Sequence, residues 1–182
     1  MAVRRKHIRA TVEDLLTKHR IRTAPVDVER IAELLGVEVV REPTDEDLSG
    51  YLLRDLEQRK AIIGVNGRHH KNRQRFTIAH ELAHLLLHEG ERVHIDRDHR
   101  GYQIDLRSEE SSKGTNESEI EANLFAAELL MPKQFLEEDL RKLGPVDLLD
   151  LNEAALASLA TKYKVSPQAL TFRLANLGYV HL

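Results

Sequence analysis

Residues 76–88 read FTIAHELAHLLLH and contain two histidines four residues apart, with a glutamate directly after the first. On a helix, residues four apart lie on adjacent turns of the same face, so His80 and His84 can present their imidazoles to a single metal ion. Glu81 points away from that pair, where a carboxylate can act as a base toward a water at the metal. The pattern predicts a helix that carries two metal ligands and a catalytic base.

The residues around the two histidines favour this interpretation over an ordinary amphipathic helix with histidines at its polar edge. Most positions in the stretch are apolar, so a helix here is buried on most sides and its histidines need polar partners. A catalytic zinc site combines three protein ligands with an open fourth position. One more ligand must come from elsewhere, and it is not a thiolate, because the chain has no cysteine.

The best candidate for the third ligand lies in the helical run of residues 119–132. Glu119 and Asn123 fall on one stripe of that helix together with two alanines, which would let it approach the histidine helix closely. Glu119 can then complete a His-His-Glu site, and Asn123 can orient a ligand through a hydrogen bond. Glu121 is the alternative ligand; it lies about 200° round the helix from Glu119, so an unbroken helix directs one of the two at the metal.

The segments RFTIAHELAHLLLH and EIEANLFAAELLMP, which begin at Arg75 and Glu119, resemble the ImmA/IrrE family of zinc metallopeptidases. The resemblance implies a thermolysin-like site in which His80, His84 and Glu119 bind Zn²⁺ and Glu81 is the catalytic base. It also implies a substrate, because members of this family cleave a helix-turn-helix transcriptional repressor and so derepress stress, mobile-element or defence genes. A link to the DNA damage response belongs to the same resemblance.

The remaining segments predict an α+β fold, in which a small antiparallel sheet packs against a helical bundle that carries the histidine helix. Apolar runs at residues 37–40, 49–53 and 61–66 predict three strands, the last two forming a hairpin. A chain of 182 residues can form one compact domain. We assign residues 1–146 to a metallopeptidase domain and residues 147–182 to a C-terminal helical part of the same domain.

The C-terminal part resembles a helix-turn-helix in outline, with two helices joined at residues 164–167. Ser166 fits a helix N-cap, Pro167 fits the first helical position, and Gly178 ends the last helix. The second helix carries Arg173 as its only cation and is otherwise largely apolar, which favours packing over the reading of a DNA groove. A DNA-binding regulator is therefore the weaker interpretation.

The segment between the two ligand-bearing helices is predicted to pass near the metal. Residues 93–95 and 102–106 alternate like the strands of a hairpin, and the remainder is polar. Such a segment can act as a lid over a substrate. Tyr102, His94 or His99 could supply the hydrogen bond that stabilises the oxyanion of a tetrahedral intermediate.

The charge pattern bears on possible partners. A formal net charge of −3 argues against binding of nucleic acid by bulk charge. Basic residues nevertheless cluster at the N-terminus and directly before the histidine helix, where Arg68, Lys71, Arg73 and Arg75 lie close together in sequence. An ordinary solvated surface is the simpler interpretation; the alternative is that an anionic activator such as single-stranded DNA binds near the active site.

The location of the protein is predicted from what its sequence lacks. The chain has no apolar run long enough to span a membrane, and its basic N-terminus lacks the apolar region of a secretory signal. The absence of cysteine fits a reducing compartment. We expect a cytoplasmic, zinc-dependent endopeptidase with no membrane partner. The alternative is a non-catalytic zinc-binding protein that sequesters a repressor.

Overall fold

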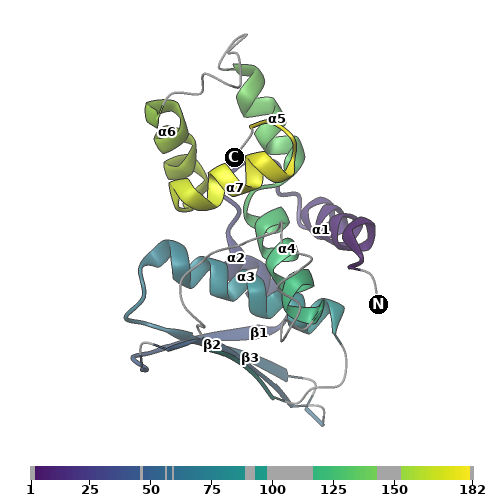
Figure 1. Cartoon of the computed structure of the whole chain (residues 1–182). Coiled ribbons are helices and arrows are strands. Elements are labelled where there is room, and N and C mark those ends of the chain that lie inside the picture. The colour runs from purple at the N-terminus through teal and green to yellow at the C-terminus, as the bar shows by residue number, and fades with distance from the viewer. Residues whose placement is uncertain are drawn as a thin grey trace.

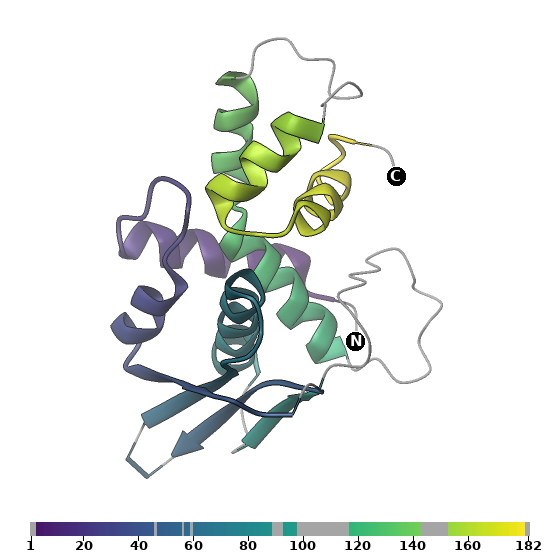
Figure 2. The same cartoon turned by 90° about the vertical axis from the view of Figure 1, so that its left-hand side faces the viewer.

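The computed structural model describes residues 3–45, 47–55, 57–58, 60–88, 93–97, 117–142 and 153–180. All structural statements below concern these residues. They form an α+β fold in which a four-stranded sheet is covered on one face by helices (Figures 1 and 2). The expected fold class is confirmed.

Within the described residues the chain forms seven helices: α1 (Arg5–Lys18), α2 (Val28–Leu34), α3 (Lys71–Leu87), α4 (Glu117–Leu130), α5 (Lys133–Lys142), α6 (Glu153–Tyr163) and α7 (Pro167–Asn176). The predicted histidine helix is α3, and the helix predicted to supply the third ligand is α4. The predicted start of α7 is confirmed, since Oγ of Ser166 accepts a hydrogen bond from the backbone N–H of Ala169. A transmembrane helix is not found in the described part of the chain, where every helix is too short or too polar.

The sheet contains β1 (Val37–Glu42), β2 (Leu48–Asp55), β3 (Lys60–Asn66) and β4 (Val93–Arg97), in the order β1-β3-β2-β4. The predicted hairpin is confirmed in β2 and β3, and β4 pairs antiparallel with the other edge of β2. The expectation of a small antiparallel sheet is confirmed for β2, β3 and β4, whereas β1 pairs with β3 in parallel. The reason is strand order: β1 lies beside β3 instead of β2, and β2 runs opposite to both.

Helix α3 lies on the sheet, with α2 beside it and α4 packed against it, and is buried on nearly all sides (Figures 1 and 2). Its residues Ile78 and Leu82 are fully buried in the same hydrophobic core as strand residues of β2 and β3. Gly50 of β2 permits this close packing, since a Cβ there would lie 2.4 Å from Cγ2 of Thr77 and 3.8 Å from Oε1 of Glu81. The missing side chain lets α3 lie directly on the sheet.

Helix α4 packs against α3 and also contacts the C-terminal helices. Oε2 of Glu128 lies 2.7 Å from the guanidinium of Arg173 in α7, and Nε of Arg173 donates to the carbonyl of Met131 at 3.1 Å. The hydroxyl of Tyr163 in α6 donates to Asp139 of α5 at 2.9 Å. Arg173 is only 6% exposed, so the cation of the second C-terminal helix faces the protein interior. This arrangement agrees with the packing interpretation of these helices.

Candidate metal centre

Helices α3 and α4 bring His80, His84 and Glu119 together where the two helices pack. Nε2 of His80 lies 3.2 Å from Oε2 of Glu119, and Nε2 of His84 lies 3.3 Å from Oε1 of the same carboxylate. The two Nε2 atoms are 3.1 Å apart. The three side chains that the sequence predicts as ligands therefore lie together in the structure.

The separations within this cluster fit a single metal ion. Zinc bonds of about 2.0–2.1 Å in a tetrahedral site place neighbouring donor atoms about 3.3–3.4 Å apart. The two Nε2 atoms lie 3.1 Å apart, and they lie 3.2 and 3.3 Å from the two different oxygens of Glu119, so each separation is close to that spacing. Imidazole nitrogens and a carboxylate group are also donor types that zinc accepts. The donor set therefore fits a divalent metal ion.

Asn123 holds the ring of the first histidine. Its Oδ1 lies 3.1 Å from Nδ1 of His80, one turn of α4 beyond Glu119. Because Nε2 of His80 faces the other donor atoms, Nδ1 carries the ring proton and donates it to the Asn123 oxygen. The structure places Asn123 where the sequence analysis expects an orienting hydrogen bond.

Glu81 is completely buried beside the cluster, and both of its carboxylate oxygens lack a hydrogen-bond partner among the residues described. Burial raises the pKa of Glu81 to about 8. The positive charge of His80 lowers this pKa, and the negative charge of Asp96 raises it further. Buried carboxyl groups are normally hydrogen-bonded, and a strongly shifted pKa in a cluster of this kind is typical of a functional site. The position suits a group that acts on a molecule bound at the cluster.

The two histidines differ in charge. Burial lowers the pKa of His84 to about 4, so its imidazole is neutral near pH 7. Burial also opposes a charge on His80, but the hydrogen bond to Glu119 and the charge of Glu81 outweigh it and raise the pKa of His80 to about 9. Burial disfavours an ionised Glu119, yet its hydrogen bonds to both histidines hold its pKa well below the usual range. Near pH 7 the metal-free site therefore holds His80 as an imidazolium ion and His84 as a neutral imidazole.

Strand β4 borders the cluster with two further side chains. The ring of His94 stacks on that of His84 with centroids 3.7 Å apart, and its Nε2 lies 3.5 Å from Oε1 of Glu119. Asp96 forms a second potential metal-binding group with His80 and Glu81, whose ligand atoms lie within 4.8 Å of one another. The sequence analysis did not identify Asp96; its alternation with His94 along a strand was the available signal.

His94 is the one predicted oxyanion-stabilising residue that the structure places at the cluster. Tyr102 and His99 lie outside the described residues. The predicted hairpin strand at residues 102–106 lies outside them as well, whereas the strand predicted at residues 93–95 is confirmed as part of β4.

Glu121, the alternative third ligand, points away from the cluster. Its Oε2 lies 2.6 Å from the guanidinium of Arg4 and 3.1 Å from Nε2 of His88. The arrangement follows from the helix, since residues two apart lie on nearly opposite faces. Glu119 alone of the two carboxylates joins the histidine pair.

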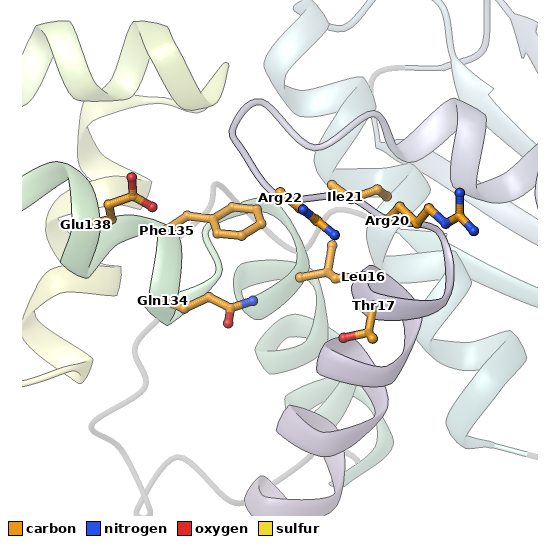
Figure 3. A pocket seen from close by; sticks show the side chains of 8 residues that line it. All are labelled: Leu16, Thr17, Arg20, Ile21, Arg22, Gln134, Phe135 and Glu138. Atoms are coloured by element: carbon orange, nitrogen blue, oxygen red, sulfur yellow. The ribbon is translucent and has the colours of Figure 1, made fainter.

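A cavity of about 460 Å³ opens beside Phe76, one turn before His80 on α3. The rings of Phe76 and His80 lie 6.3 Å apart between centroids, but none of the cluster residues is part of the wall of this cavity. Its other walls come from the end of α4 and from the start of α7 at Pro167. A separate cavity of about 340 Å³ lies between the end of α1 and α5, where Leu16 and Phe135 form part of its wall (Figure 3). The cluster residues are absent from the wall of that second cavity as well.

Comparison with known proteins identifies similar sequences and a similar fold. The chain matches the peptidase family described as IrrE N-terminal-like domain over residues 32–175. It is 34% identical over 115 residues to the radiation response metalloprotease IrrE of Deinococcus deserti, and 31% identical over 115 residues to the protein of that name from Deinococcus radiodurans. Each match covers 63% of this chain but only 36% and 31% of the two relatives. The chain spans about a third of the length of the curated relatives it matches.

Among solved structures, a Mycobacterium tuberculosis transcriptional regulator matches with a TM-score of 0.57 and 18% sequence identity. The match covers 93% of this chain and 46% of that chain. At this level of identity the similarity concerns the fold alone.

Proposed function

The chain belongs to the peptidase family of IrrE N-terminal-like domains, and from that premise we propose that it is a zinc-dependent, site-specific endopeptidase. The observation that best supports this proposal is the buried Glu81, whose carboxylate has no hydrogen-bond partner within the described residues although it adjoins the donor cluster. A helix with a purely structural role has no use for a buried carboxyl of this kind, because burying it unpaired costs free energy.

Each residue of the cluster has a distinct role in this proposal. His80 and His84 would hold the zinc ion through Nε2, and Glu119 would hold it through its carboxylate. When bound, the zinc ion supplies Lewis acidity, which polarises a peptide carbonyl and lowers the pKa of water. Glu81 would accept the proton of the attacking water and deliver it to the leaving amine.

Strand β4 would position the substrate. It is an outer strand of the described sheet, and an extended peptide can pair with a strand edge through main-chain hydrogen bonds. His94, on the same strand, would donate a hydrogen bond to the oxyanion that forms from the peptide carbonyl. The cavity beside Phe76 would accept an apolar side chain of the peptide.

The substrate we propose is a helix-turn-helix transcriptional repressor, whose cleavage would derepress stress, mobile-element or defence genes. The sequence resemblance supports this choice, and the names of the two curated relatives favour a stress response such as the response to radiation. A repressor substrate also requires a cytoplasmic location. An activating single-stranded DNA would have to use cations other than Arg4 and Arg75, because Arg4 binds Glu121 and Arg75 donates to the carbonyl of Val26.

Co-expression with the helix-turn-helix repressor encoded nearest the gene tests this function. The wild type should cut the repressor at one bond, identified by intact mass, and Glu81→Gln should reduce the rate by at least about 10²-fold while zinc stays bound. Equal cleavage by the variant would disprove the role of Glu81. Zinc-loaded protein that binds the repressor without cutting it, with and without Glu81, would favour the non-catalytic alternative.

A further inference from the structure

His88 lies one turn beyond His84, where α3 ends, and the rings of the two histidines lie 5.2 Å apart between centroids. Nδ1 of His88 lies 3.3 Å from Nδ1 of His84. On its other side, Nε2 of His88 lies 3.1 Å from Oε2 of Glu121. A continuous chain of contacts therefore runs from the donor cluster, through His88, to the opposite face of α4.

The ring protons along this series of contacts, from His84 through His88 to Glu121, can be placed in one consistent way. Nε2 of His84 faces the donor cluster, so a metal bound there takes its lone pair and leaves the ring proton on Nδ1. That N–H can donate to Nδ1 of His88, which places the proton of His88 on Nε2. Nε2 of His88 then donates to the carboxylate of Glu121, which only accepts. Every contact in the chain is satisfied at once.

Arg4, just before α1, binds Glu121, the last residue in this series of contacts. Its guanidinium donates to both oxygens of Glu121, from Nε to Oε1 at 3.0 Å and from its terminal nitrogen to Oε2 at 2.6 Å, and its backbone N–H donates to Oε1 at 2.8 Å. The same guanidinium donates to the carbonyl of Leu87, the last residue of α3, at 3.2 Å. A carboxylate bound at two points in this way is held in one orientation toward His88.

We propose that Arg4, Glu121 and His88 are positioning residues that hold the ring of His84 in the tautomer and orientation needed for metal binding. This inference rests on the proposed metal site, and it adds three residues that lie outside the set of candidate metal ligands. A carboxylate that accepts from the imidazole chain raises the basicity of Nε2, and such partners typically change metal affinity about 10–100-fold.

Zinc affinity of the full chain, measured by competition with a chromophoric chelator, tests the proposal. His88→Ala should weaken zinc binding about 10–100-fold, and Glu121→Gln about tenfold, because glutamine keeps the shape but loses the charge. His7→Ala is the matched control, since His7 is an exposed histidine of α1. Circular dichroism of the metal-free variants establishes that each is folded, and Co²⁺-substituted protein should show a changed visible spectrum for His88→Ala but not for His7→Ala.

The double variant separates a positioning chain from a general weakening of the fold. If Glu121 acts on the metal through His88, adding Glu121→Gln to His88→Ala should change the zinc affinity less than about twofold. Additive losses would overturn the proposal, and so would wild-type affinity in His88→Ala. No peptide is needed for this measurement, so a wild type that binds zinc but cuts no repressor defeats the proposed function alone. A wild type that binds no zinc defeats both.

Discussion

The two ends of α4 each set a glutamate against basic side chains, but the chemistry of the partners differs. Near the start of the helix, Glu119 faces the imidazoles of His80 and His84. Near its end, Glu128 faces the guanidinium of Arg173. Arginine always carries its charge, so the second pair is neutral as it stands, whereas imidazoles can give up a proton and accept a metal cation instead. The kind of base opposite the carboxylate distinguishes a metal site from a structural ion pair.

Replacement of the glutamate at the metal end should have the largest effect. Glu119→Ala should weaken zinc binding by about 10³-fold or more, because structural zinc sites contribute roughly 10–16 kcal/mol and the loss of one of three protein ligands removes a large share of the binding free energy. Competition with a chelator measures the loss. Glu128→Gln, tested in the same way, should bind zinc like the wild type. Equal losses of zinc affinity in Glu119→Ala and Glu128→Gln would show that the start of α4 is not a distinct metal site.

At the other end of α4, the effect should appear in stability. Glu128→Gln leaves Arg173 buried without its carboxylate, which should lower the free energy of unfolding by about 3 kcal/mol. Urea denaturation of the metal-free protein measures this change. Glu153→Gln, at an exposed glutamate of α6, is the control and should change stability by about 0.5 kcal/mol or less. A neutral result for Glu128→Gln would mean that Arg173 finds other partners.

The pH dependence of metal binding gives the smallest effect. The pKa of His80 is about 9 in the metal-free site, so a metal bound below that pH must displace one proton. The apparent zinc affinity should therefore rise about tenfold for each pH unit between about pH 6 and pH 8. Calorimetric titration in buffers of different ionisation enthalpy should report one proton released from His80, and a second where the carboxyl of Glu81, whose pKa is about 8, ionises as the metal binds. Glu128→Gln should show the same dependence of zinc affinity on pH as the wild type. A zinc affinity that does not change with pH would mean that His80 carries no proton that the metal displaces.

The side chains that α3 and α4 direct at the metal site could be predicted, because helical periodicity determines which side chains share a face of each helix. His80, His84, Glu119 and Asn123 all follow from spacings of three or four residues, and the same geometry separates Glu119 from Glu121. The structure places all four at one point. Their roles stay predictions until a metal is measured there.

Contacts between distant segments could not be predicted in this way. Arg4 and Glu121 are 117 residues apart, and no local pattern links them. The parallel pairing of β1 with β3 has the same cause, since strand order depends on which edges the folded chain leaves available. Asp96 reaches the cluster only because β4 pairs with β2, a long-range pairing that the alternation of residues 93–95 does not specify.

Helix α4 has ion-pair contacts near both of its ends. Near its start, Glu119 contacts α3 and Glu121 contacts Arg4 just before α1; near its end, Glu128 contacts α7. Its backbone amides can exchange with solvent only when the helix opens, and opening breaks both sets of contacts. We therefore expect the start of α4 and the C-terminal helices to open together. A bound metal, by stabilising the closed form, slows amide exchange in the middle of α4 and also in α7, where no residue touches the cluster.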